Sequence, residues 1–496
     1  MLLVVLPLII LAVGAGASFV LGKAARTRGA DVSSVLALVS LAGAFATFIA
    51  LYGPVGQVAP EYPFGAVKLR ADGLAVLLGL IATGLGFVVT LYSMVHMRGD
   101  READRPLYTA LFLLLITGVA GLGLAGDLFN LYIFFELMAI SSYALVAYYR
   151  LRTDAVEAGM KYLVMNGAGS IVALVGIGVV YLSSPSGPSI PNNLDLQYLA
   201  SIHLPPENGL LAAALLIVGF GVKAAVVPMH TWLPDAYTAA PTSISAILGG
   251  IVTQSGLIAM VRSLSILGVG SGTIGVSYGV LLGLLAVLTM TVGNLTAMRQ
   301  RDLKRMLAYS SIAQAGYVLL GFAVGLEFGQ VALIGVIGAL FHILNHALMK
   351  GGAFLAAGAL EDAYGTRDLD DLKGAGRRSP WLGAAFGVFV LGLAGVPPTA
   401  GFLSKLLIAS GATYGGGLGV FFVVALIANS ILSLAYYVPA LTGLWSKEAP
   451  VAGERRLRLP LVAIVVVMAA LVIALGLWPG FADYLQPAAR SIVGGP

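Results

Sequence analysis

Long apolar segments recur along almost the whole sequence, and they constrain the fold more than any other feature. A helix that crosses the hydrocarbon core of a membrane needs about 20 largely apolar residues. By that criterion, fourteen candidate spans begin near residues 2, 32, 73, 107, 128, 158, 209, 243, 273, 304, 329, 380, 417 and 459. Helices satisfy their own backbone hydrogen bonds in lipid, whereas open strands and loops do not. The sequence therefore predicts an all-α polytopic membrane protein with about 14 transmembrane helices.

The composition leaves little room for a soluble domain. Of the 496 residues, 59% are hydrophobic and 10% are charged, which lies far outside the usual mix for soluble domains. The longest polar connections are residues 53–72, 183–208 and 361–379. The first span lacks the basic n-region of a signal peptide, so we expect it to be retained. We expect one membrane domain over residues 1–496.

The positive charges follow the predicted topology. If the N-terminus is outside, the loops after the odd-numbered spans are cytoplasmic, and they hold 21 of the 28 Lys and Arg residues, Lys304 and Arg305 among them. This asymmetry is the positive-inside pattern of membrane proteins. We expect a multi-pass protein of the cell membrane with both termini outside. Because topology accounts for the basic balance, no nucleic-acid partner is expected.

Three lysines and one glutamate fall inside the apolar spans. They are Lys223, Lys350, Lys405 and Glu136. Ionisable groups inside a membrane are costly and usually functional. The simpler alternatives are a packing role for Glu136, hydrogen-bonded to a neighbouring Ser or Tyr, and lysine side chains that reach the headgroups.

A column of titratable residues marks the eleventh span. His342, His346 and Lys350 are four residues apart, so they lie on one helix face and drift about 40° per step. Histidine exchanges protons near neutral pH, which suggests a proton relay. The alternatives are packed core histidines or a two-histidine metal site, and the second is disfavoured because no third ligand lies on that face.

Two spans, the seventh and the twelfth, are interrupted by proline. Pro228 follows Lys223, and Pro397 and Pro398 precede Lys405. Proline removes a helical hydrogen bond, and paired broken helices are typical of inverted repeats in transporters. We expect two inverted five-helix repeats, at about 107–268 and 273–442. Spans 1–3 would occupy about 2–96 and the last span about 459–478.

Redox chemistry finds no support on this chain. There is no cysteine, which excludes iron–sulfur clusters held by this chain alone. The segment GLGLAG, residues 121–126, matches GxGxxG but ends a membrane span and follows no strand, so helix packing explains it better than dinucleotide binding. We expect no cofactor-binding residues, no cofactor and no metal site.

Five segments resemble one known superfamily. They are GDLFNLYIFFELMAISSYAL, GVKAAVVPMHTWLPDAYTAAPTSISA, QRDLKRMLAYSSIAQAGY, FHILNHALMKGGAFL and GLAGVPPTAGFLSK. In this order they resemble the antiporter-like membrane subunits of respiratory complex I, Mrp-type cation/proton antiporters and membrane-bound hydrogenases. The resemblance covers nearly the whole chain, and the first and last segments look most like the Mrp D-type subunit.

The resemblance implies a role for each intramembrane ionisable residue. The family's helix 5 glutamate falls on Glu136 and its helix 7 lysine on Lys223. The polar residues of helix 11 fall on His342, His346 and Lys350, and the helix 12 lysine falls on Lys405. The matching segments also contain His230 and Asp235, which are supporting candidates. Gln254 is a further supporting candidate and a departure, because many relatives have lysine there and glutamine cannot hold a proton.

These observations lead to one hypothesis and two alternatives. The hypothesis is a subunit that moves protons, or exchanges protons for Na⁺, along a buried Glu–Lys–His–Lys axis. We expect Glu136 and Lys223 to form an ion pair that holds Lys223 protonated. Its expected partners are the lipid bilayer, homologous antiporter-like subunits, small membrane subunits and, in some complexes, a redox arm. One alternative is the proton-pumping subunit of a complex I-like oxidoreductase linked to NADH/quinone or ferredoxin, or of a hydrogenase. The other is a self-sufficient cation transporter. Whether the chain counts as part of an enzyme stays open.

Overall fold

The computed structural model describes residues 2–25, 31–55, 59–64, 67–98, 104–185, 192–267, 277–447 and 458–493. Five basic residues assigned to the predicted cytoplasmic side lie outside these ranges, namely Arg26, Arg28, Arg101, Arg455 and Arg456. The predicted boundary between the two repeats, near residues 268–273, also lies outside them.

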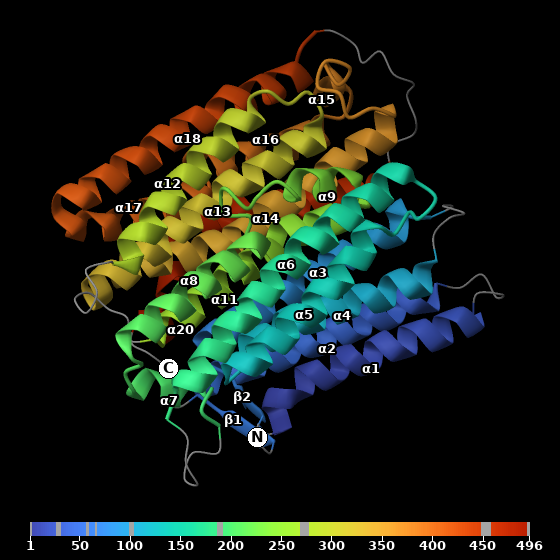
Figure 1. The fold of residues 1–496 in the computed structure, drawn as a ribbon. Coiled ribbons are helices and arrows are strands. Elements are labelled where there is room, and N and C mark those ends of the chain that lie inside the picture. Colours follow the sequence, from blue (N-terminus) through green and yellow to red (C-terminus); the bar gives the residue numbers. More distant parts are fainter. Residues whose placement is uncertain are drawn as a thin grey trace.

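Helices dominate both halves of the described chain (Figure 1). The first half contains α1 (Leu2–Ala25), α2 (Val32–Val55), β1 (Glu61–Phe64), β2 (Val67–Arg70), α3 (Gly73–His96), α4 (Arg105–Leu124), α5 (Leu128–Val146), α6 (Thr153–Ser183), α7 (Leu196–Ser201), α8 (Pro206–Lys223), α9 (Leu233–Ala239), α10 (Thr242–Ile247), the π-helical η2 (Leu248–Val252) and α11 (Thr253–Ser265). The second half contains α12 (Tyr278–Ala297), α13 (Leu303–Phe328), η3 (Gly329–Ala332), α14 (Leu333–Tyr364), α15 (Ala375–Arg378), α16 (Pro380–Ala394), α17 (Ala400–Ala412), η4 (Thr413–Gly415), α18 (Gly416–Leu444), α19 (Leu459–Gly476), η5 (Pro479–Leu485) and α20 (Gln486–Val493).

Twelve stretches of the described chain are long and apolar enough to cross a membrane. One of them, Leu303–Tyr364, contains both α13 and α14, and another, Ala400–Leu444, contains both α17 and α18. The shorter apolar helix Pro380–Ala394 precedes α17. With α16 and α17 counted as one interrupted pass, the described helices make the predicted number of passes. The prediction of an all-helical polytopic membrane protein is confirmed.

The seventh and twelfth passes are broken, as the prolines predicted. α8 ends at Lys223 and helix resumes at Leu233 in α9, whereas α16 ends at Ala394 and helix resumes at Ala400 in α17. Each broken pass packs against one long unbroken helix. α8 and α9 lie along α6, and α16 and α17 lie along α14. The matched arrangement supports the predicted inverted repeats, which remain a prediction.

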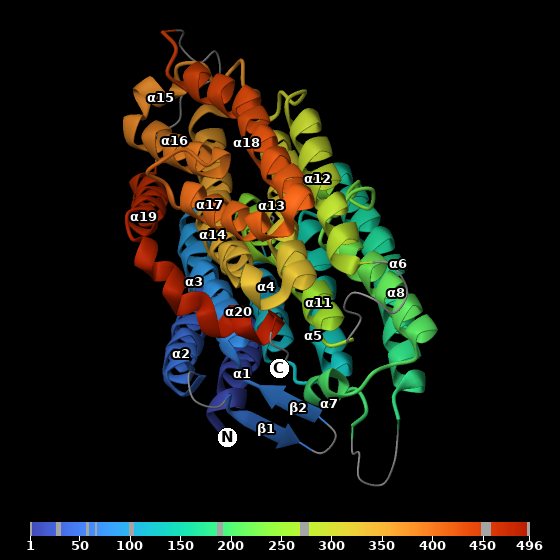
Figure 2. The ribbon, with the colours of Figure 1, turned by 90° about the vertical axis from the view of Figure 1, so that its left-hand side faces the viewer.

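Different contacts hold the helices together at the two ends of the bundle. At one end the β1–β2 hairpin lies near both described termini (Figure 2). Apolar periodicity did not predict this hairpin, and Lys68 anchors it through ion pairs to Glu61 at 3.1 Å and Asp195 at 3.2 Å. At the other end, ion pairs join helix ends and connecting segments that are distant in sequence, such as Arg105 at the start of α4 with Asp31 at 2.8 Å.

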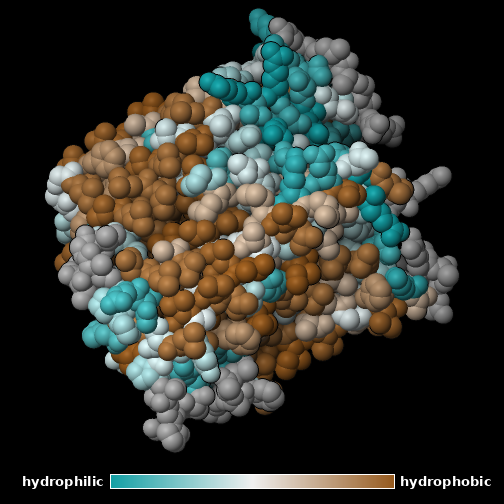
Figure 3. Space-filling model, in the orientation of Figure 1, coloured by the Kyte–Doolittle hydropathy of each residue, from teal (hydrophilic) through white to brown (hydrophobic). Residues whose placement is uncertain are grey.

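Hydrophobic residues cover most of the flank of the bundle that faces the viewer in Figure 3. Hydrophilic residues gather at the end where α15 lies, and smaller hydrophilic areas lie at the opposite end. An apolar flank between two polar ends fits a helical bundle that stands in a bilayer.

Candidate functional site

Lys223 lies at the end of α8, inside the bundle. The amide of Val226 bonds to the carbonyl of Gly221 at 3.0 Å, and the amide of Ala225 bonds to that of Val222 at 3.1 Å. This is the Schellman motif, which needs a left-handed residue, and Ala225 supplies it with φ of 52°. Lys223 therefore occupies the last turn of a half-helix, where the helix dipole favours a cation.

The ammonium of Lys223 is bonded within the protein rather than at the headgroups. Lys223 is 1% exposed, and its Nζ donates to the hydroxyl of Tyr162 at 2.6 Å and to that of Ser142 at 3.1 Å. The Nζ also lies 5.0 Å from the ring centroid of Tyr143. Such contacts partly replace the water that a buried cation loses. The alternative that Lys223 reaches the membrane surface does not hold.

Glu136 lies half-buried on α5 and accepts a hydrogen bond from Ser170 on α6. In the described chain it forms no ion pair with Lys223, although the two are within electrostatic range. The direct ion pair that we expected is therefore absent from this conformation. The hydrogen bond from Ser170 is the contact that the packing alternative predicted for Glu136.

His342, His346 and Lys350, which we call the titratable column, all lie fully buried on α14, the eleventh pass. Their spacing predicted that they share one helix face. The ring centroids of His342 and His346 lie 6.2 Å apart. Lys350 donates to the hydroxyl of Ser310 and, at 3.1 Å, to the carbonyl of Leu307. Among the described residues, no group of three or more His, Cys, Asp or Glu side chains is placed to hold a metal ion.

Gln254 lies beside the middle of this column. It is fully buried on α11, and its amide nitrogen is 3.3 Å from Nδ1 of His346. Gly256 brings α11 so close to the broken pass that an added Cβ would lie 2.8 Å from the nitrogen of Ala224. Helix α11 therefore lies between the end of α8 and the titratable column, with Gln254 beside His346.

Lys405 lies across the break in the twelfth pass. It is 4% exposed, and its Nζ donates to the carbonyls of Leu393 at 2.8 Å and Ala394 at 3.1 Å, in the last turn of α16. Those carbonyls have no partner within their own helix, and the helix dipole makes them attractive to a cation. Lys405 thus completes the end of α16 from the start of α17.

One chain of hydrogen bonds joins Lys405 to the titratable column on α14. The carbonyl of Leu393 also accepts from Nε2 of Gln314 at 3.0 Å, and Oε1 of Gln314 lies 3.0 Å from Nε2 of His342. Nδ1 of His342 lies 2.9 Å from the hydroxyl of Ser404. His342 is thus linked through Gln314 to the carbonyl that accepts from Lys405.

Helix α13 supplies partners that sequence reasoning missed. Ser310 contacts Lys350, Gln314 contacts His342, and the ring of Tyr317 lies 4.0 Å from Nζ of Lys405. These residues are three or four positions apart and share one helix face. The polar spacing within QRDLKRMLAYSSIAQAGY was a signal for this face, because an apolar span rarely repeats polar residues at helical intervals.

Lys304 lies elsewhere than the sequence predicted when it was counted among the basic loop residues. The sequence placed it in a cytoplasmic loop, but it is 2% exposed and donates to the carbonyl of Ala240 at 2.8 Å. Ala240 caps the C-terminus of α9. A lysine suits that position for the same reason as at α16, because unpaired carbonyls meet there. The local sequence DLKR gave no sign that Lys304 points inward and Arg305 outward.

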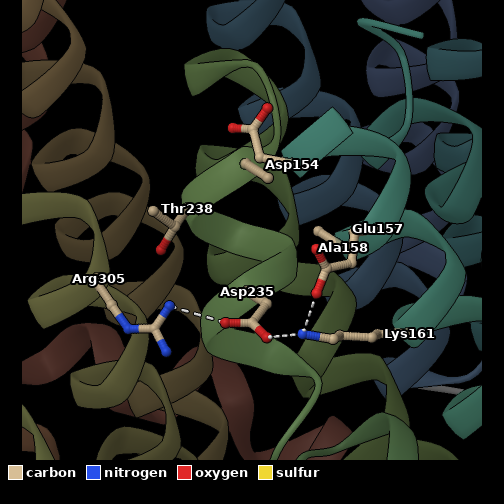
Figure 4. Close-up of a pocket in the computed structure, with 8 residues that line it drawn as sticks. Asp154, Glu157, Ala158, Lys161, Asp235, Thr238 and Arg305 are labelled. Atoms are coloured by element: carbon tan, nitrogen blue, oxygen red, sulfur yellow. Dashed lines mark hydrogen bonds and ion pairs between the residues drawn. The ribbon is translucent and has the colours of Figure 1, made fainter. Parts of the chain in front are cut away.

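A charged cavity of about 200 Å³ opens at the end of the bundle where the basic loops meet. Figure 4 shows Asp235 of α9 between Lys161 of α6, at 3.1 Å, and Arg305 of α13, at 2.8 Å. Asp235 therefore ties the second half of the broken seventh pass to both neighbouring helices. His230 lies half-buried in the loop between α8 and α9.

Comparison with known proteins matches this arrangement to one family. Residues 125–433 match a family model described as NADH:quinone oxidoreductase/Mrp antiporter, TM. The chain is 34% identical over 393 residues to the N subunit of NADH-quinone oxidoreductase from Desulforudis audaxviator, covering 79% of this chain and 75% of the relative. It is also 34% identical over 352 residues to the D-type subunit of a Na⁺/H⁺ antiporter from Alkalihalophilus pseudofirmus, covering 70% of this chain and 66% of the relative.

Chains of similar structure occur in solved membrane complexes. A chain of the membrane-bound sulfane sulfur reductase, an archaeal respiratory membrane complex, superposes with a TM-score of 0.85 at 29% identity, covering 99% of this chain and 97% of that one. A chain of the Mrp complex from Dietzia sp. DQ12-45-1b gives a TM-score of 0.85 at 25% identity, covering 100% and 97%. The structural likeness extends over the full length of the chain.

Proposed function

Because this chain belongs to the NADH:quinone oxidoreductase/Mrp antiporter family, we propose that it moves protons across the membrane as one subunit of a larger complex. The similar solved chains come from multisubunit membrane complexes, which supports partner subunits of the same kind. We further propose that protons follow an axis from Glu136 and Lys223 through His346, Lys350 and His342 to Lys405.

The row of buried titratable side chains is the observation that carries this proposal. Lys223, Lys350 and Lys405 are each at least 96% buried, yet each has hydrogen-bond partners. A lysine inside a membrane costs about 2.5–3.5 kcal/mol even on lenient scales. Three such groups on separate elements, with two histidines between them, are hard to explain by packing alone.

Charge at Glu136 would control whether Lys223 holds its proton. Two unit charges roughly 5–10 Å apart, at an effective dielectric constant of about 20, interact by about 2–3 kcal/mol. That energy changes a proton affinity by more than tenfold. When a neighbouring protein of the complex pulls the charge of Glu136 away, Lys223 would release its proton past Gln254 toward His346. Lys350 and His342 would pass it on, and Gln314 would orient His342 toward Lys405.

Asp235 would mark the entrance on the side that we predict to be cytoplasmic. The cavity beside it lies at the polar end of the bundle and is lined by Lys161, the residue before Tyr162. Tyr162 in turn contacts Lys223. Protons collected among the charged groups of the cavity would thus have a short route to Lys223.

Replacement of Lys223 by alanine tests the proposal. Lys223→Ala should abolish coupled proton translocation by the intact complex, measured as acidification of inside-out vesicles, while assembly of the complex stays near normal. Lys373→Ala is a matched control, because Lys373 lies in a connecting segment with its side chain 40% exposed and pairs with Asp370 at 3.1 Å. Full proton movement in Lys223→Ala would refute the axis.

The driving force and a role for Na⁺ need a separate experiment. Relatives include subunits of NADH-quinone oxidoreductases and of a Na⁺/H⁺ antiporter, so both settings stay open for this chain. Purification of the complex from its native membrane and identification of its subunits distinguishes them. Iron–sulfur proteins in the complex would indicate a redox-driven pump, whereas their absence and Na⁺-dependent proton flux would indicate an antiporter. Na⁺ flux through the isolated chain in liposomes would favour the self-sufficient transporter.

A further inference from the structure

Helix α6 links the two groups that we place at the start of the proton axis. Tyr162, Asn166 and Ser170 are four residues apart, so they form a column that rises about 6 Å per step. Tyr162 accepts the hydrogen bond from Lys223, and Ser170 donates one to Glu136. The two ends of the column therefore contact Lys223 and Glu136, which do not contact each other directly.

Asn166 lies in the middle of this column, and its side-chain amide is buried without hydrogen-bond partners in the described protein. Its side chain is buried, at 3% exposure, and neither Oδ1 nor Nδ2 has a hydrogen-bond partner in the described protein. An amide side chain can donate two hydrogen bonds and accept two. Buried polar groups are nearly always satisfied by protein or by ordered water. Asn166 is therefore suited to hold water.

We propose that Asn166 is a positioning residue that holds water between Tyr162 and Ser170 and thereby couples Glu136 to Lys223. This inference rests on the proposed function and deepens it. Nδ2 of Asn166 would donate to one water and Oδ1 would accept from another. The resulting chain runs from the Lys223 ammonium through the Tyr162 hydroxyl, water and Ser170 to the Glu136 carboxylate.

The surroundings of Lys223 leave few other routes for this coupling. The titratable groups that face it are Tyr143 and Glu136 on α5 and Tyr162 on α6. Gly169 keeps the neighbouring surface of α6 small, since an added Cβ there would lie 2.8 Å from Cβ of Val222. Close packing of α6 on α8 thus places the polar column beside the end of α8.

The test compares variants of Asn166 with Glu136→Gln in the intact complex. Asn166→Leu keeps the branched shape of the side chain and removes its hydrogen bonds, and it should lower coupled proton translocation about tenfold. It should also move the alkaline limb of the rate–pH profile to lower pH, as Glu136→Gln does, because both changes deprive the Lys223 ammonium of its coupling to a carboxylate. Asn166→Ser, which can still hold water, should restore most of the rate.

Other results would overturn the inference. A normal rate in Asn166→Leu would do so, and so would a rate lowered equally at every pH with Asn166→Ser equally impaired, since that pattern indicates packing. Where Asn166→Leu fails to assemble, Asn166→Ala replaces it in the comparison because it adds no bulk. A wild-type rate and profile in Glu136→Gln would instead refute the proposed role of Glu136, whatever Asn166 does.

Discussion

Two buried lysines of this protein, Lys405 and Lys304, are held by the ends of interrupted helices. Lys405 completes the last turn of α16, and Lys304 donates to the residue that caps α9. A helix end inside a membrane leaves carbonyls without partners, and an ammonium group satisfies them while gaining from the dipole. Breaking a helix and burying a lysine are each costly, but at these positions each reduces the cost of the other.

A buried ion pair near the β1–β2 hairpin holds two helices together. Arg262 on α11 lies 2.7 Å from Asp72, which caps α3, and it also donates to the carbonyl of Gly123 at 2.7 Å. Arg262→Met should destabilise the protein by about 3–5 kcal/mol, because the buried Asp72 would lose its cationic partner. Thermal unfolding of the purified complex measures this. The double variant Asp72→Asn/Arg262→Met should recover much of the loss, and equal instability in both variants would contradict the explanation.

At the scale of elements, the break in the twelfth pass depends on a close backbone approach. A Cβ on Gly401 would lie 1.9 Å from the carbonyl oxygen of Gly392, closer than any side chain tolerates. Gly401→Ala should therefore push α17 away from α16 and weaken the bonds from Lys405 to α16. We expect a loss of coupled translocation of at least about tenfold.

Gly16→Ala is the matched control for Gly401→Ala. Gly16 also lies within a helix, and a Cβ there meets no atom within 4 Å. This change should leave translocation at the wild-type rate, since alanine favours helix more than glycine does. Equal effects of the two substitutions would show that the approach of Gly401 to Gly392 is unimportant.

At the scale of the whole molecule, the two polar ends should face different compartments. The absence of cysteine from the sequence makes labelling of single introduced cysteines a clean measurement. Glu207 begins α8 on the side predicted to be outside, and Asp370 lies on the side predicted to be cytoplasmic; both residues are exposed. In right-side-out vesicles, an impermeant maleimide should label Glu207→Cys at once and Asp370→Cys only after permeabilisation. The reverse order would invert the predicted topology.

The sequence by itself determined what its local patterns encode. Apolar length predicted the helices, prolines predicted the two breaks, and four-residue spacing predicted the buried column on α14. These predictions succeed because a helix in lipid must satisfy its own backbone, so that length and periodicity leave few alternatives.

Only the tertiary structure decided which side chains meet. It separated Glu136 from Lys223, gave Gln314 and Ser310 their partners on α14, and turned Lys304 inward while Arg305 faces Asp235. It also brought Tyr162 and Ser170 of α6 to the two residues that start the proposed axis. Such contacts join helices that are distant in sequence, and they depend on how helices rotate and approach one another. No local pattern records that rotation, because each helix face is chosen by its neighbours.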